Sequence, residues 1–284
     1  MQLDETSIAT DMFNYSFKPK LERKFQLFAD HGFSYIHWKD DYYNDVFYTK
    51  QDIKEYRQCL DSYGLQCIDV HGTATRLFCI DAEDKDFLNQ YIRLLKNRIE
   101  FCAALGGDAV VIHPPNEIAG SDKWSRSLQR SLQVFTCVKP LCEDLGITLA
   151  VENCFPTDEK ILEFYFARYP PEFVGFCFDS GHANCNRNFK LLLPLAERLK
   201  ALHLHDNKGI KKKAEFLAKL KCDAHQPPYW GTIDWMRVMG WIKERKYSKP
   251  INFEITHRFE LFDGTMEDFL SYTVLSINKL IQEY

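Results

Sequence analysis

The chain has 284 residues, of which 45% are hydrophobic and 27% are charged, and these values are typical of a globular domain. Its formal net charge is −4, whereas proteins that bind nucleic acid through its phosphates usually carry a basic excess. The composition therefore favours a small-molecule partner and argues against nucleic acid. The densest basic run, Lys211-Lys212-Lys213, is short and is interpreted as a solvated loop.

The ten cysteines include no Cys-x-x-Cys pair, and several of them, such as Cys67 and Cys177, lie inside apolar runs. This pattern predicts free buried thiols in a reducing compartment. The N-terminal Met-Gln-Leu-Asp-Glu is acidic and lacks the apolar segment of a signal peptide. No uninterrupted apolar run approaches the roughly 18 residues needed to cross a membrane. We therefore expect a cytoplasmic protein with no membrane partner.

Short apolar runs alternate with longer amphipathic segments along the chain. The expected strands are residues 7–10, 35–38, 65–70, 109–113, 148–152, 174–178, 201–205 and 251–255. The expected helices are residues 21–31, 52–63, 84–105, 125–145, 159–169, 189–199, 234–246 and 266–283. Within the helices apolar residues recur three and four positions apart. Glycine stops four of them just before the next strand, at Gly32, Gly64, Gly106 and Gly146.

Eight strands that alternate with eight helices predict a parallel sheet closed into a (β/α)8 TIM barrel, which would form a single domain over residues 1–284. An open doubly wound sheet would instead carry a Gly-x-Gly-x-x-Gly turn after an early strand, and the sequence has none. The one long irregular stretch, residues 207–232, follows the seventh expected strand. A loop of that length in a compact domain is usually functional.

In such barrels the chemistry lies on the loops that follow the strands. Most of the histidines and several acidic residues fall at or just after the expected strand ends. These are His71, His113, His182, His203, His205, His225 and His257, together with Glu152, Asp179, Asp206, Asp223 and Glu254. Of the other two histidines, His31 closes a helix, where a cation suits the helix dipole, and His37 lies within the second strand.

Each of these residues also has a purely structural interpretation. A lone strand-end histidine is often only hydrogen-bonded, Asp179 could cap the next helix, and Glu152 could pair with a surface lysine. However, Glu152, Asp179, His203 and Glu254 end the expected strands five to eight, which are neighbours in a barrel, so their side chains can converge. Buried carboxylates are costly unless a cation or hydrogen bonds compensate them. The pattern therefore predicts a divalent-metal site of the kind that zinc, manganese or cobalt occupies.

Several short motifs occur in strand order along nearly the whole chain. They are Val-His71, Val-Ile-His113-Pro, Val-Glu152-Asn, Phe-Asp179-Ser-Gly-His182, His203-Leu-His205-Asp206-Asn, Asp223-Ala-His225, Gly231-Thr-Ile-Asp234-Trp and Phe-Glu254. Each motif is weak by itself. Taken together in this order, they resemble the xylose-isomerase-like barrel superfamily, which holds sugar isomerases and epimerases and the endonuclease-IV-type DNA repair enzymes.

In the isomerase and epimerase members one divalent ion is held by two Glu, one Asp and one His, which the resemblance carries over to Glu152, Glu254, Asp179 and His203. His205 competes with His203, but the family spacing His-x-x-Asp, which fits His203 to Asp206, favours His203. The ion could be Zn, Mn, Co or Mg.

The resemblance also implies a reaction on a sugar, sugar phosphate or cyclitol. Glu152 and Glu254 would move a proton next to a carbonyl through an enediolate, and His182 would hydrogen-bond a substrate oxygen. Phe13, Trp38 and Trp230 could pack on the sugar or in the core, and Lys208 and Arg258 could bind a phosphate locally. By analogy with the family, the chain would form a homo-oligomer.

A competing hypothesis comes from the endonuclease-like members, which hold three zinc ions on nine ligands. The matching positions are His71, His113, Glu152, Asp179, His182, His203, Asp223, His225 and Glu254, and a multinuclear site could cleave a phosphate ester. The acidic charge balance, the lack of a basic and aromatic groove signature and the altered loop Tyr229-Trp230-Gly231-Thr-Ile-Asp count against DNA repair.

Two further alternatives stay open. A metal-dependent lyase or dehydratase also begins by removing a proton next to a carbonyl, and a non-catalytic barrel could keep the metal residues for stability. An isomerase or epimerase is therefore the favoured function. His71, His113, His205, Asp223 and His225 are additional candidates for binding a metal or the substrate.

Overall fold

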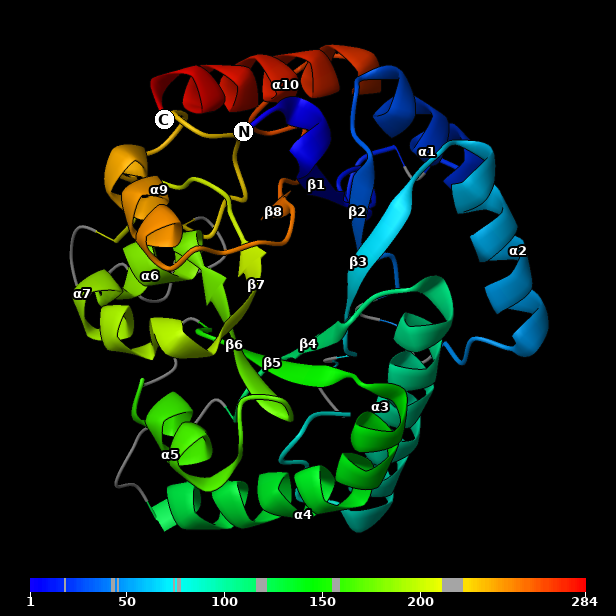
Figure 1. The fold of residues 1–284 in the computed structure, drawn as a ribbon, viewed down its shortest axis with the longest axis vertical. Helices are drawn as coiled ribbons and strands as arrows, with labels where there is room; N and C mark the ends of the chain where they lie inside the picture. The colour runs from blue at the N-terminus through cyan, green and yellow to red at the C-terminus, as the bar shows by residue number, and fades with distance from the viewer. Residues whose placement is uncertain are drawn as a thin grey trace.

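The computed structural model is the expected single (β/α)8 barrel, and it describes residues 1–17, 19–41, 44, 46–73, 75, 78–115, 122–154, 159–210 and 222–284 (Figure 1). The strands are β1 Thr6–Ala9, β2 Tyr35–Trp38, β3 Gln66–His71, β4 Ala109–Ile112, β5 Thr148–Glu152, β6 Val174–Asp179, β7 Leu199–His203 and β8 Ile251–Phe253. The helices are α1 Leu21–Asp30, α2 Lys50–Ser62, α3 Lys85–Leu105, α4 Asp122–Leu145, α5 Lys160–Arg168, α6 Ser180–Asn186, α7 Phe189–Leu192, α9 Trp235–Glu244 and α10 Met266–Glu283. Two short 3₁₀ helices, η1 Leu3–Glu5 and η2 Leu193–Arg198, complete the described elements.

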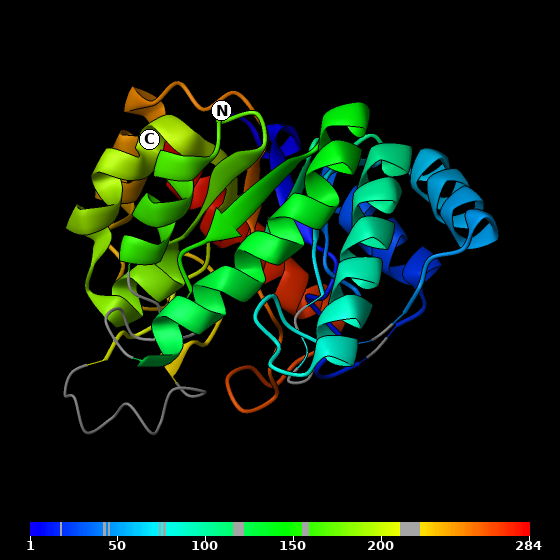
Figure 2. The ribbon, with the colours of Figure 1, turned by 90° about the horizontal axis from the view of Figure 1, so that it is seen from below.

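All strands run parallel, and their order is β7-β6-β5-β4-β3-β2-β1-β8. The ring is closed by backbone hydrogen bonds between β7 and β8: Leu204 N donates to Asn252 O at 3.0 Å, and Glu254 N donates to Leu204 O at 3.0 Å. All strand C-termini therefore lie at one end of the barrel. In Figure 2 the orange loop after β8 projects from that end, whereas both chain termini lie at the other.

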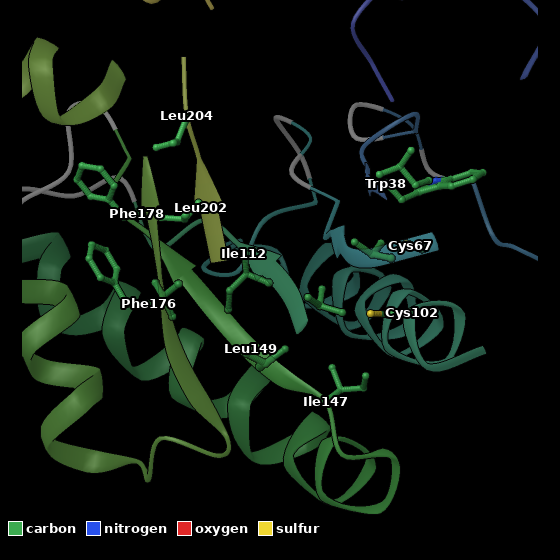
Figure 3. Close-up of a cluster of buried hydrophobic side chains, with 14 of the residues drawn as sticks. Trp38, Cys67, Cys102, Ile112, Ile147, Leu149, Phe176, Phe178, Leu202 and Leu204 are labelled. Atoms are coloured by element: carbon green, nitrogen blue, oxygen red, sulfur yellow. The ribbon is translucent and has the colours of Figure 1, made fainter. Parts of the chain in front are cut away.

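The barrel has two kinds of apolar interior. Large side chains such as Leu149, Phe176 and Phe178 point outward from the strands and pack against the helices (Figure 3). A separate cluster of small buried residues comes from the alternate positions of β4 to β7: Ala109, Val111, Ala150, Cys177 and Ala201. Because successive strand residues point to opposite faces, this second set faces the inside of the barrel. The alternation therefore decides which side chains line the interior.

Most expected elements are confirmed to within a few residues, and two predictions were wrong. The expected helix 189–199 is broken: α7 ends at Leu192, η2 follows, and Leu199 already belongs to β7. Pro194 is the physical reason, because proline lacks the N–H that continues an α-helix. The expected strand 201–205 is shifted, since β7 ends at His203.

Further expectations concern the helix-stopping glycines, the cysteines and the long loop. The four helix-stopping glycines all have positive φ, between +66° and +91°, as predicted. The ten cysteines are free, but the prediction that they are buried is correct for only part of them, since Cys137 is exposed and Cys59, Cys79 and Cys222 are partly exposed. The predicted basic loop, Lys211-Lys212-Lys213, and part of the long segment 207–232 lie outside the described residues. Among the described residues, no helix is both long and apolar enough to cross a membrane.

Candidate functional site

Four predicted site residues end consecutive strands and face the barrel interior. Glu152, Asp179 and His203 are the last residues of β5, β6 and β7, and Glu254 directly follows β8. Each is at most 1% exposed. The alternation of strand side chains therefore brings three carboxylates and one imidazole to the same end of the barrel, as the sequence predicted.

Three of the four side chains, Asp179, His203 and Glu254, lie close enough to share one ion, and Glu152 lies next to them. His203 Nδ1 lies 2.7 Å from Glu254 Oε2 and 3.3 Å from Glu152 Oε2. Asp179, His203 and Glu254 each offer an atom within 4.8 Å of the others, and so do Glu152, Asp179 and His182. Asp179 belongs to both sets, and Glu152 of the second set lies 3.3 Å from His203 of the first. The two sets therefore form one continuous cluster.

The atoms that face each other in this cluster lack hydrogen bonds. Glu152 Oε2, Glu254 Oε2 and both ring nitrogens of His203 are buried without a hydrogen-bond partner among the described residues. Buried polar atoms are nearly always hydrogen-bonded, and an exception requires an explanation. A divalent cation explains this one, because oxygen and imidazole nitrogen donors suit zinc, manganese or cobalt. The donor set therefore fits a bound metal.

Two more histidines approach Glu152 from the neighbouring strands. His71 ends β3 and places Nε2 3.5 Å from Glu152 Oε2. His113 follows β4 and places Nε2 3.3 Å from the same oxygen, with 29% of its side chain exposed. Glu152 therefore lies at the centre of this group of side chains, and His113 is the member of the group that is partly exposed to solvent.

A second group lies beside the first. Asp223 Oδ2 is 3.3 Å from His182 Nε2 and 3.3 Å from His225 Nε2. His205 Nε2 lies 3.1 Å from Asp179 Oδ2, and its ring stacks on that of His225 with centroids 3.8 Å apart. All the predicted metal, catalytic and additional site residues are therefore gathered at one end of the barrel.

The histidines in this site differ in protonation. Burial lowers the pKa of His203 and of His225 to about 4, so both are neutral and able to act as ligands. Burial also opposes the charged form of His182, but the Asp179 and Asp223 carboxylates outweigh it and raise the pKa of His182 well above its usual value. His182 is therefore protonated and is a hydrogen-bond donor.

The structural interpretation of Asp179 is confirmed. It is the N-cap of α6, and its Oδ1 accepts a hydrogen bond of 2.6 Å from His182 N. Its Oδ2 is left to face the cluster. The sequence analysis did not predict α6 as a helix, although Asp-Ser-Gly-His carries the capping residue that begins it.

The glycine of that motif has a steric role. A Cβ atom on Gly181 would lie 2.0 Å from Cε1 of His205. Ser180 Oγ donates to the His205 carbonyl oxygen at 2.8 Å. The turn after β6 and the segment after β7 are therefore packed too closely for any side chain larger than hydrogen at this position.

Lys39 is a charged residue of the site that was not predicted from the sequence. Lys39, directly after β2, is 8% exposed and forms ion pairs with Glu254 and, at 3.7 Å, with Asp11 Oδ2. Its position at a strand end was the available signal, but only metal-ligand residue types were considered there. Lys39 places a fixed positive charge against the carboxylate cluster.

Several other candidates lie elsewhere. Phe13 and Trp38 are buried in the core at 0% and 1% exposure, so the core alternative holds for both. His257 hydrogen-bonds Ser16 Oγ at 2.8 Å, and Asp206 accepts a hydrogen bond from Trp235 Nε1 at 2.9 Å. These polar contacts anchor loops rather than contribute to the cluster.

Three more residues from the sequence analysis lie outside the cluster. His31 is the C-cap of α1, which confirms its structural interpretation. Trp230 packs near Phe262, with ring centroids 6.1 Å apart. Lys208 is exposed.

Comparisons with known proteins agree with this geometry. A family profile described as xylose isomerase-like TIM barrel matches residues 25–270. An uncharacterised protein, y4fM, of Sinorhizobium fredii (strain NBRC 101917 / NGR234) is 29% identical over 265 residues, which cover 82% of this chain and 80% of that protein.

Two solved structures share the fold. One, of a D-tagatose 3-epimerase-like protein, has a TM-score of 0.70 at 20% identity and covers 97% of this chain and 99% of that one. The other, of the IOLI protein with a bound zinc atom, has a TM-score of 0.71 at 18% identity and covers 98% of each chain. From the family match and the strand-end site, the chain belongs to the xylose isomerase-like TIM barrel family.

Proposed function

We propose that the protein is a metal-dependent isomerase or epimerase of a sugar, a sugar phosphate or a cyclitol. The observation that carries the proposal is the convergence of Glu152, Asp179, His203 and Glu254 at one end of the barrel. Buried atoms of Glu152, His203 and Glu254 have no hydrogen-bond partner among the described residues. The proposal is supported by the similar solved structures, which include a D-tagatose 3-epimerase-like protein and a zinc-bound IOLI protein. A cytoplasmic location and a homo-oligomeric state stay predictions.

Glu152, Asp179, His203 and Glu254 are the residues that would hold the divalent ion. When bound, the ion would supply a Lewis acid that polarises the carbonyl and hydroxyl oxygens of the substrate. Bound there, the ion would also offset the mutual repulsion of the three buried carboxylates. Zn, Mn, Co and Mg are the candidate ions, and the donor set alone does not choose among them.

The protein's own groups would carry out the proton transfer. Glu152 and Glu254 both approach Nδ1 of His203, at 3.3 and 2.7 Å, so their carboxylates lie near each other, and the proposal puts the substrate carbon between them. One carboxylate would remove the proton next to the carbonyl, and the other would return a proton to the opposite face or to the neighbouring carbon. His182, which is protonated, would donate a hydrogen bond to a substrate oxygen and so stabilise the developing negative charge.

The proposal predicts exchange of a carbon-bound hydrogen with solvent. Purified protein supplied with Mn²⁺ or Co²⁺ and incubated in D₂O with a panel of ketoses, ketose phosphates and cyclitol ketones should incorporate one deuteron next to the carbonyl of its substrate. Mass spectrometry and proton NMR of the recovered sugar measure this. A product of unchanged mass apart from deuterium indicates an isomerase or epimerase, whereas loss of water indicates the lyase or dehydratase alternative. Absence of exchange from the whole panel, with cleavage of abasic-site DNA, would contradict the proposal.

A multinuclear hydrolase is the second candidate, and one observation favours it. The group His182, Asp223 and His225 could hold a further ion beside the first, and His71 and His113 add donors next to Glu152. Metal analysis of the purified protein separates the two functions, since about one ion per chain supports the isomerase and about three zinc ions support the hydrolase.

A further inference from the structure

A buried polar pair lies inside the barrel, next to the proposed metal site. His37 of β2 and Asp69 of β3 are 0% and 1% exposed, and His37 Nδ1 is 2.6 Å from Asp69 Oδ1. On β4 to β7 the interior cluster consists of alanine, valine and cysteine side chains. Burying a carboxylate and an imidazole among such residues costs free energy. Because an apolar pair would avoid this cost, the polar pair indicates a functional role.

The contacts of Asp69 decide which nitrogen of His37 carries its hydrogen. The Lys249 ammonium lies 3.5 Å from Asp69 Oδ2 and favours the charged form of this carboxyl group. Asp69 is therefore a carboxylate and can only accept hydrogen bonds. His37 consequently donates from Nδ1 to Asp69, and its Nε2 is left as an acceptor.

The ring of His37 lies beside a histidine of the proposed metal site. The rings of His37 and His203 have centroids 4.7 Å apart. His203 turns Nδ1 toward Glu254 and Glu152. His37 Nε2 and His203 Nε2 are both buried without a hydrogen-bond partner among the described residues. One of these nitrogens needs a donor and the other needs an acceptor.

The other nearby histidine is already engaged. His71 lies 5.5 Å from His203 between ring centroids, but its Nδ1 is bonded to the Gly72 carbonyl oxygen at 2.8 Å. Its Nε2 faces Glu152 at 3.5 Å. His37 is therefore the imidazole that remains available to His203.

We propose that Asp69 and His37 are positioning residues that hold His203 in the orientation and tautomer needed to bind the ion. Asp69 accepts the hydrogen on His37 Nδ1. With the ion bound, a small rotation of the two rings would let His37 Nε2 accept the hydrogen on His203 Nε2, the two nitrogens that have no hydrogen-bond partner among the described residues, and His203 Nδ1 would present its lone pair to the site between Glu152 and Glu254. The inference rests on the proposed metal site. Groups that hydrogen-bond a metal-binding histidine in this way fix its ring and its tautomer, and losing them weakens metal binding about 10- to 100-fold.

The test compares variants of the metal-free protein by their affinity for Co²⁺. His37→Leu removes the relay, and His37→Gln supplies an amide that can donate to Asp69 and accept from His203. Asp69→Leu/Lys249→Met replaces the buried ion pair with apolar side chains and leaves no unpaired charge. The matched control is Ser7→Ala, which removes a buried hydrogen bond to Asn252 Oδ1, 3.0 Å long, elsewhere in the barrel interior.

Three measurements are made on each variant: the Co²⁺ dissociation constant by competition with a chromogenic chelator, the visible spectrum of bound Co²⁺, and the unfolding midpoint of the metal-free protein. We expect His37→Leu and Asp69→Leu/Lys249→Met to bind Co²⁺ about 10- to 100-fold more weakly, with altered spectra. His37→Gln should lie nearer to the wild type than His37→Leu, and Ser7→Ala should match the wild type.

Two outcomes would overturn the positioning role. One is wild-type affinity in His37→Leu. The other is a loss of affinity that follows the unfolding midpoint equally in all variants, including Ser7→Ala. If instead the wild-type protein fails to bind Co²⁺, the proposed metal site itself is contradicted, which separates the two failures.

Discussion

Replacing Glu152 with glutamine is expected to lower kcat for the sugar reaction by about 10²- to 10⁴-fold, the usual contribution of a general acid or base. Four imidazoles surround this carboxylate: His182 at 2.9 Å, His113 and His203 at 3.3 Å, and His71 at 3.5 Å. An amide of the same shape cannot take a proton, and it is a poor metal ligand. Steady-state kinetics on the substrate found by deuterium exchange measures the effect.

Glu143→Gln is the matched control for this variant. Glu143 lies on α4, its side chain is 58% exposed, and it pairs with Lys139 at 3.2 Å. The same chemical change there should leave kcat within about twofold of the wild type, because surface substitutions rarely matter. If Glu152→Gln folded normally and kept more than half of the wild-type kcat, Glu152 would not be a proton carrier.

Removing the divalent ion is expected to abolish turnover and to lower the unfolding midpoint by on the order of 10 °C. A ligand at about 1,000 times its Kd stabilises the folded state by about 4 kcal/mol, and for a chain of this size each kcal/mol shifts the midpoint by roughly 2–4 °C. The physical source is the set of buried carboxylates, Glu152, Asp179 and Glu254, which face each other when no cation is bound.

Calorimetry and activity assays measure this effect before and after dialysis against a chelator, with dialysis against the same buffer without chelator as the control. Adding back Mn²⁺, Co²⁺ or Zn²⁺ should restore both activity and midpoint, and the ion that restores them best identifies the preferred metal. A verified metal-free protein with full activity and an unchanged midpoint would show that the cluster serves another purpose.

The sequence predicted the barrel well where local pattern alone decides the structure. The apolar run that ends in Glu152 gives β5 with the expected bounds, and α10 also begins and ends as expected. The carboxylate cluster could be predicted because strand order and side-chain alternation suffice to place Glu152, Asp179, His203 and Glu254 together. No knowledge of loop structure was needed for this step.

Other features depend on contacts that are distant in the sequence. The start of β7 is set by pairing with β6, where Leu199 pairs with Phe176 and the register shifts before Cys177. Such an irregularity leaves no local pattern in the sequence. The alternating Ala-Leu-His-Leu-His run after residue 200 therefore looked like the whole strand, although the strand ends at His203.

The polar interior of the barrel was also missed for a physical reason. His37 was placed only within the second strand, because its partner Asp69 is 32 residues away and Lys249 is 180 residues beyond Asp69. Lys39 was missed in the same way, since its contact with Glu254 joins opposite ends of the chain. Only closure of the barrel brings these charges together.

The most direct test of the account is a crystal structure of the protein reconstituted with Zn²⁺ or Co²⁺, with data collected at the absorption edge of the metal. We predict an anomalous peak bonded to Glu152, Asp179, His203 and Glu254, with metal–ligand distances of about 2.0–2.2 Å. A protein that binds the metal but shows its anomalous peak away from these four side chains would contradict the central claim.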